Sequence, residues 1–196
     1  MKKIRTIVAV LACLITANTY AEKKADFWSA VKNRTSVRQW QDKPVSKADL
    51  EDIVRAGMAA PTAMNRQPWR FLVITDRAER NALADRVERG GMYRDAAALI
   101  VVCGDMDAAI PGDGRDFWVQ DCSAATENML LAVTAKGLGA VWTGVYPMKK
   151  RTEALQQALG LPQSIIPLNV VLVGYPKDTP KPKDKWKPEN IHWEKW

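Results

Sequence analysis

The chain has 196 residues, of which 47% are hydrophobic and 26% charged, and its formal net charge is +7. These values describe one globular domain with a sizeable core and leave no need for a second domain. The single histidine, His192, excludes a multi-histidine metal site, and the dispersed Cys103 and Cys122 form no zinc pattern. We therefore expect no metal, and we expect both thiols to be buried and free.

The N-terminus carries basic residues, then an apolar run over residues 7–15 and a small-residue cleavage pattern at Thr19-Tyr20-Ala21. This order predicts a secretory signal peptide at residues 1–21, with a periplasmic or secreted domain at residues 22–196. The run is shorter than the roughly 20 residues that span a membrane, so no stable span is expected. Lipoprotein cleavage ahead of Cys13 is a less favoured alternative.

Hydrophobic periodicity predicts several helices and strands along the rest of the chain. Ser46, with Asp49 three residues later, is a typical helix start. The helices are expected at residues 26–33, 46–59, 77–89, 116–136 and 149–159, and the strands at residues 69–75, 98–103, 140–146 and 169–174. Because strict βαβ alternation is missing, the pattern indicates a layered α+β domain.

The sequence Arg-Thr-Ser-Val-Arg at residues 34–38 follows the first helical pattern. Its two guanidinium groups and two hydroxyls suit a phosphate, which arginine binds through paired hydrogen bonds. A solvated surface is the alternative interpretation of so short a basic segment.

Residues 60–71 read Ala-Pro-Thr-Ala-Met-Asn-Arg-Gln-Pro-Trp-Arg-Phe and lead into a strand. Two prolines restrict the backbone on either side of Asn65 and Gln67, so a stiff loop presents both side-chain amides. Such amides donate and accept hydrogen bonds and match a flat ligand with ring carbonyls and nitrogens. An ordinary helix-to-strand connection is the alternative.

The Pro- and Lys-rich stretch after residue 176 predicts an extended C-terminal arm over residues 176–196. Trp186, Trp193 and Trp196 argue against a disordered tail, since disordered segments are poor in aromatic residues. We expect these three side chains to be buried against another surface.

Few side chains in this chain are suited to catalysis. No dinucleotide-binding or phosphate-loop glycine motif follows a strand, and Asp105 and Asp107 fit a strand cap better than a cation site. A protein so composed must take its chemistry from a bound cofactor.

The two motifs at residues 34–38 and 60–71 occur together with Gly-Leu-Gly-Ala-Val-Trp-Thr-Gly at 137–144, Gly-Tyr-Pro at 174–176 and Lys-Pro-Lys-Asp-Lys at 181–185. In this order the chain resembles the FMN-dependent nitroreductases over about residues 26–196. The resemblance implies an α+β layered fold with a central mixed or antiparallel sheet flanked by helices. It also implies a homodimer whose protomers exchange C-terminal arms.

The resemblance further implies which residues bind FMN. The phosphate and ribityl chain would be held by Arg34, Thr35, Ser36, Arg38, Lys183 and Lys185. The ring would be covered from the partner subunit by Pro61, Thr62, Ala63, Met64 and Asn65, with Gln67 at its edge or at the ribityl chain. Thr143 and Gly144 would bring a backbone N–H to the redox nitrogen, and no side chain would be catalytic, because the flavin carries the chemistry.

The resulting expectation is an oxidoreductase that works by ping-pong half-reactions. NAD(P)H would be the donor, or a periplasmic redox partner if the chain is exported, and the acceptor would be a nitroaromatic, a quinone or a flavin. A non-catalytic flavin carrier or redox sensor is the alternative. Nucleic-acid binding by the Lys/Trp arm is disfavoured, because acidic residues interrupt its charge.

Overall fold

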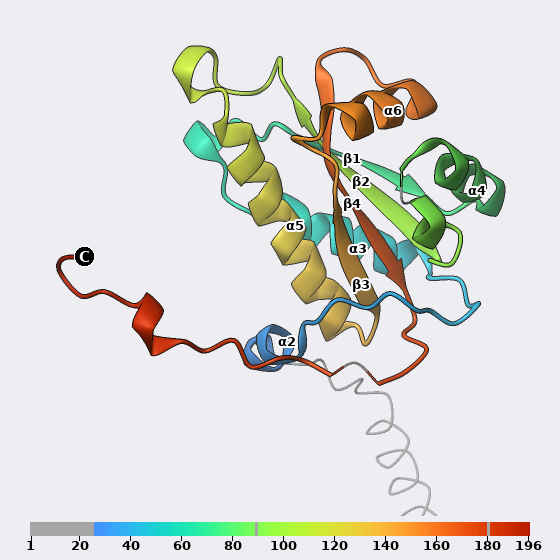
Figure 1. Cartoon of the computed structure of the whole chain (residues 1–196), viewed down its shortest axis with the longest axis horizontal. Helices are drawn as coiled ribbons and strands as arrows, with labels where there is room; N and C mark the ends of the chain where they lie inside the picture. The colour runs from blue at the N-terminus through green and yellow to red at the C-terminus, as the bar shows by residue number, and fades with distance from the viewer. Residues whose placement is uncertain (1–25, 89, 180) are drawn as a thin grey trace, which may run out of the picture.

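The structure, a computed structural model, describes residues 26–88, 90–179 and 181–196 (Figure 1). The expected signal peptide and Cys13 lie outside these ranges. Within them, no helix combines the length and the apolar character that crossing a bilayer requires.

A four-stranded antiparallel sheet forms the centre of the described fold, in the order β1-β2-β4-β3. The strands are β1 (Trp69–Ile74), β2 (Ala98–Asp105), β3 (Gly139–Gly144) and β4 (Ile165–Gly174). The two central strands are almost wholly buried, because their mainly apolar residues face helices on both sides. The α+β expectation is confirmed.

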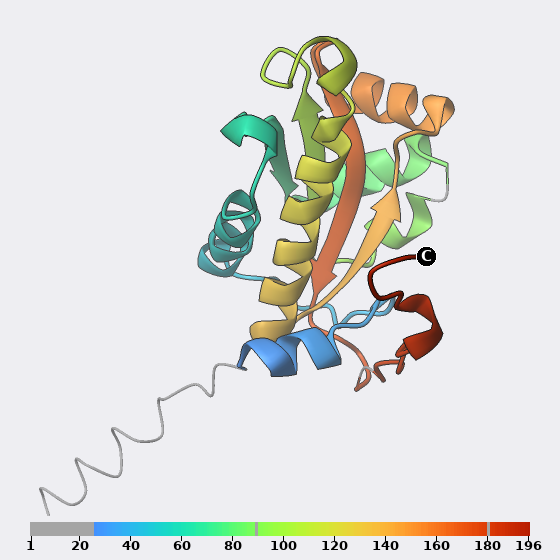
Figure 2. The same ribbon diagram turned by 90° about the vertical axis from the view of Figure 1, so that its left-hand side faces the viewer.

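Helices cover both faces of the sheet (Figure 2). On one face lie α3 (Lys47–Met58) and α5 (Phe117–Ala135), which pack on Ile100 and Val102 of β2. On the other lie α4 (Arg77–Arg86) and α6 (Lys149–Leu159), which pack on the alternate residues Leu99 and Val101. The period-two alternation of β2 thus divides the core into two layers.

Local signals set most of the helix ends. Asp26 accepts a hydrogen bond from the backbone of Ser29 and caps α2 (Phe27–Asn33), and Ser46 caps α3 in the same way, as expected. The helix α4 ends at Arg86, earlier than the sequence suggests, because Val87 is extended and a short 3-10 turn, Gly90–Tyr93, follows.

Residues 36–40 run beside the sheet and bring the first basic motif to β3. Ser36 forms a parallel bridge with Ala140, and Trp40 an antiparallel bridge with Pro176. Trp40 also packs so closely on Gly174 that a Cβ there would lie 2.7 Å from its ring. This pairing fixes the point at which the C-terminal arm leaves the domain.

The arm passes α2 and projects beyond it, with one short turn at Pro188–Asn190 (Figure 1). Its tryptophans are exposed, with Trp186 at 70%, Trp193 at 77% and Trp196 at 99%. The expectation that they are buried is therefore not met within one protomer.

Candidate functional site

Three of the cations predicted to bind phosphate meet at one hollow beside α2. This hollow, about 510 Å³ in volume, is lined by Lys32 and Arg34 at the end of α2 and by Lys183 and Lys185 from the arm, with Asp184 as its one acidic lining residue. Residues nearly 150 positions apart in the sequence thus meet because the arm runs past α2. We call this hollow the cation hollow.

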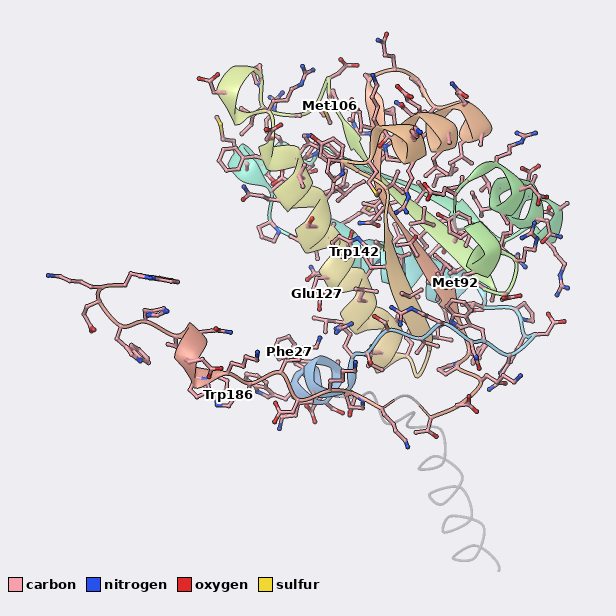
Figure 3. The ribbon with its side chains drawn as sticks, in the orientation of Figure 1. Phe27, Met92, Met106, Glu127, Trp142 and Trp186 are labelled. Atoms are coloured by element: carbon pink, nitrogen blue, oxygen red, sulfur yellow. The ribbon has the colours of Figure 1, made fainter. Side chains whose placement is uncertain are left out.

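Arg34 also has an anionic neighbour on α5. Its Nε lies 3.6 Å from a carboxylate oxygen of Glu127, which projects from α5 (Figure 3). The backbone N–H of Arg34 donates to the carbonyl of Ala30 at 2.9 Å, which fixes the residue at the end of α2. The backbone of Arg34 is therefore fixed at the end of α2, and its guanidinium faces Glu127.

The rest of the first motif extends away from the cation hollow. Ser36 is exposed beside β3, with Thr35 partly buried before it, whereas Arg38 lines a separate hollow with Arg77 and Arg94. An extended chain advances about 13 Å over four residues, which accounts for the separation of Arg38 from Arg34. The structure does not bring these two arginines together.

The end of β3 is open on one side and supported on the other. Gly144 is exposed, and a Cβ there would meet nothing within 4 Å, so a planar group has room to approach. Behind it, Arg151 donates to the Gly144 carbonyl at 3.4 Å, and the Thr143 hydroxyl donates to the Val170 carbonyl at 2.9 Å. Trp142 packs partly buried against the α5 side of the core (Figure 3).

Tyr93 adds to this support from the α4 side of the sheet. Burial raises the pKa of its hydroxyl, while a hydrogen bond with the Thr143 side chain and the charge of Arg151 act in the opposite direction. Sequence analysis missed Tyr93 and Arg151, because each reaches β3 from an element distant in the sequence.

The loop over residues 60–67 is braced by its own hydrogen bonds. The Ala63 N–H donates to Asp121 Oδ1 at 2.8 Å, and the Gln67 N–H donates to Thr62 Oγ1 at 3.0 Å. The Gln67 side chain donates to Asn65 Oδ1 at 2.9 Å, so these two amides satisfy one another. Asp121 is another residue that sequence analysis missed, although a charged side chain within the apolar stripe of a helix was a readable signal.

Three residues of this loop adopt left-handed backbone conformations. The φ angles are 52° at Met64, 52° at Asn65 and 51° at Gln67. Such conformations cost non-glycine residues about 1–3 kcal/mol each and collect at functional sites. Met64 is 82% exposed, so the loop presents a rigid, strained surface outward.

The loop and the cation hollow lie on different sides of α5. The loop is bonded to Asp121 and the cation hollow borders Glu127, six residues further along. Six helical residues correspond to about 9 Å along the axis and about 240° around it. Figures 1 and 2 likewise show the loop and α2 towards opposite ends of α5. Within one protomer, the two groups of predicted site residues do not form one site.

The two cysteines are buried and free, as expected. Burial raises the pKa of the Cys103 thiol to about 12 and that of Cys122 further, so neither is a ready nucleophile. Among the described residues, no three His, Cys, Asp or Glu side chains are arranged to hold a metal ion.

Comparisons with known proteins all give one family. The model of the Nitroreductase family matches residues 31–90 and 88–175. A protein of Archaeoglobus fulgidus, whose name proposes an NADH dehydrogenase/NAD(P)H nitroreductase, is 44% identical over 169 residues, 85% of this chain and 96% of its own length.

Solved structures agree with this match. A Parabacteroides distasonis protein with the same proposed activity is 42% identical, with a TM-score of 0.81 over 87% of this chain and 98% of its own. A Desulfovibrio desulfuricans protein, proposed as a nitroreductase and solved in complex with FMN, is 32% identical, with a TM-score of 0.76 over the same shares.

These relatives correct the expectation of a signal peptide and a periplasmic location. Their names specify NADH or NAD(P)H, which is not expected in quantity outside the cytoplasm. The comparisons thus do not support the signal peptide that the sequence analysis expected at residues 1–21. The signal-peptide expectation rested only on basic residues before a short apolar run. These residues lie outside the described residues.

Proposed function

Because the chain belongs to the nitroreductase family, we propose that it is a homodimeric, FMN-dependent NAD(P)H oxidoreductase that reduces an electron-poor aromatic acceptor. When bound, FMN supplies hydride chemistry in two alternating half-reactions, first with the donor and then with the acceptor. The chain's own residues bind and orient the cofactor. The observation that carries the proposal is the cation hollow of Arg34, Lys183 and Lys185, which suits a phosphate monoester.

The phosphate of FMN fits the cation hollow by its charge and by its donors. Arg34 offers a planar fork of N–H donors, and the two lysines add compact charges from the arm. On binding, Arg34 would exchange its contact with Glu127 for phosphate oxygens. Thr35, Ser36 and Arg38 would follow the ribityl chain along β3.

The ring of FMN would lie over the open end of β3, where Thr143 and Gly144 would offer a backbone N–H to its redox nitrogen. Arg151 and Tyr93 would hold this strand end from behind. A donor held in position there stabilises negative charge on the reduced ring without reorganisation.

The loop over residues 60–67 would complete the site of the other protomer. Within one chain it lies on the far side of α5 from the cation hollow, while its strained, exposed surface faces outward. In a dimer, Pro61 to Asn65 and Gln67 would therefore cover the ring bound by the neighbouring subunit.

An anaerobic absorption spectrum tests the activity. We expect purified protein to bind FMN and to lose the flavin absorbance when NADPH or NADH is added. Flavin that stays oxidised with both nucleotides would instead support the carrier or sensor function, and failure to bind FMN would disprove the whole proposal.

Subunit mixing tests the shared site. We expect Arg34→Gln and Asn65→Ala each to weaken flavin binding, because each impairs both sites of a homodimer. A mixed dimer of the two variants should regain one intact site of two, since both changes then fall on the other site. Equally weak flavin binding in mixed and unmixed dimers would show that the loop contributes to the flavin site of its own chain.

A further inference from the structure

A second basic hollow lies apart from the cation hollow, between the start of α4 and the residues that precede β2. It measures about 200 Å³, and positive charge outweighs negative among its charged lining residues, which are Lys43, Arg77, Arg80, Arg94, Asp42 and Asp95. A neighbouring hollow of about 480 Å³ shares Arg77 and Arg94 with it, so the two adjoin. We call the smaller one the arginine hollow.

Arg80 is the unusual residue of the arginine hollow. Only 5% of it is exposed, yet within residues 26–88, 90–179 and 181–196 no carboxylate lies within 4 Å of its guanidinium. Its Nη1 donates to the carbonyl of Thr75 at the end of β1. Its Nε is buried and has no hydrogen-bond partner among the described residues.

A buried arginine without a counter-ion is unfavourable, because the guanidinium does not lose its proton in proteins. Burial lowers the pKa of Arg80, and the charge of Arg77 lowers it further. The carboxylates of Asp76 and Asp42 act in the opposite direction only from a distance. An anion in the arginine hollow would relieve both the desolvation and the repulsion between like charges.

The other two arginines keep most of their donors free for such an anion. Arg77 pairs with Asp42 and Arg94 with Asp85, and all four side chains are exposed. Surface pairs of this kind contribute little and exchange readily. Each guanidinium has five N–H donors, so one pairing does not exhaust it.

We propose that the arginine hollow is a phosphate-binding site, distinct from the cation hollow, in which Arg77, Arg80 and Arg94 hold the anion. Guanidinium forks match phosphate oxygens in pairs, which favours phosphate over chloride. The small volume admits one phosphate group, and the adjoining hollow has room for a larger ligand that carries it. Inorganic phosphate and a nucleotide phosphomonoester share this chemistry.

Calorimetric titration of the FMN-saturated protein with inorganic phosphate, at constant ionic strength set with chloride, tests the site. We expect saturable binding that Arg77→Gln and Arg94→Gln each weaken by about tenfold or more, since a charge-assisted bond is lost. Both residues are exposed, so these variants should fold even if an Arg80 variant does not. Arg55→Gln removes the same charge from an exposed position on α3 and should bind phosphate as the unmodified protein does.

Three results would overturn the proposal. They are no saturable binding in the unmodified protein, equal binding in all three glutamine variants, or loss of binding in Arg34→Gln, which would place the phosphate in the cation hollow. A parallel titration with AMP separates the two sources: tighter binding than that of phosphate supports a nucleotide, and equal binding supports the free anion. Phosphate binding by a protein that never takes up FMN would refute the proposed function and leave this site standing.

Discussion

The loop over residues 60–67 and the C-terminal arm both carry residues expected to contact FMN, but the structure holds them very differently. The loop is bonded to Asp121 of α5 and between Thr62 and Gln67. The hydrogen bonds of residues 181–196 join the arm only to itself, as between Trp186 and Asp184. Both segments are exposed, so exposure alone does not distinguish them.

The difference shows what each segment requires from its surroundings. The loop has its shape before it meets any partner, and it stores strain at three left-handed residues. The arm exposes three large indole groups, which in a soluble protein mark a surface awaiting an apolar contact. A second protomer is the partner that we propose for both, but only the arm needs it to become buried.

Removing the arm should have the largest effect. Deletion of residues 177–196 takes away Lys183, Lys185 and the three tryptophans, so we expect a monomer without detectable flavin. Light scattering and the visible spectrum measure the two losses. A truncated protein that remains dimeric and yellow would show that the arm is dispensable.

Releasing the loop should have an intermediate effect. Asp121→Ala leaves the Ala63 N–H without its acceptor, at a cost of about 1–3 kcal/mol in the free energy of unfolding. We expect weaker flavin binding with the dimer intact, measured by urea denaturation and a flavin titration. Asp121→Asn retains an acceptor oxygen and should stay close to the original protein; an equal loss in both variants would refute the role of this hydrogen bond.

Improving the arm should give a smaller, opposite effect. Lys185→Arg replaces a point charge in the cation hollow with a fork that binds phosphate through two bonds, so flavin affinity should rise a few-fold. Lys187→Arg, which does not line that hollow, is the matched control. Equal affinities in the two variants would remove residue 185 from the phosphate site.

Breaking an ion-pair contact outside both segments should have the smallest effect and serves as the reference. Lys136 of α5 binds Asp49 and Asp52 of α3, each at 2.8 Å. Lys136→Gln should lower the free energy of unfolding slightly at neutral pH and leave flavin binding unchanged, since exposed ion pairs contribute little.

The pH dependence of this contact follows from the pKa shifts. The hydrogen bond from Lys136 lowers the pKa of Asp49, so its stabilisation is present above the unfolded pKa of about 3.9 and is lost as pH falls through the lower folded value. The pKa of Lys136 is raised, so at alkaline pH the stabilisation persists to about 10.4 and is lost as pH rises through the higher folded value. Denaturation across pH should show the variant and the original protein converging at both extremes.

Local patterns in the sequence predicted most elements but not every boundary. Caps such as Ser46 and the apolar stripe of α5 were readable because they depend on neighbours in the chain. The strand β4 begins at Ile165, four residues earlier than predicted, and its first half contains Pro167, a residue that strands rarely tolerate. It lies at the register shift opposite Cys103, where a bulge tolerates proline.

For the proposed site, the motifs name candidate residues but not their arrangement. The motifs named Arg34 and Lys183, and the structure brings these two together. The placement of Arg38, and the supports at Asp121 and Arg151, depend on contacts between distant segments that no local pattern encodes. The contacts that we propose for the arm would come from a second protomer, and no pattern within one chain encodes them.

If the FMN phosphate binds as proposed, the contact between Arg34 and Glu127 would make the uptake of cofactor an exchange of counter-ions. An arginine that already faces a carboxylate holds fewer mobile anions from solution, so phosphate binding releases fewer of them. The salt dependence of flavin affinity should accordingly be shallower than the number of cations lining the cation hollow implies. Replacing Glu127 with glutamine should steepen this salt dependence, because the carboxylate of Glu127 would then no longer neutralise part of the charge that the phosphate meets.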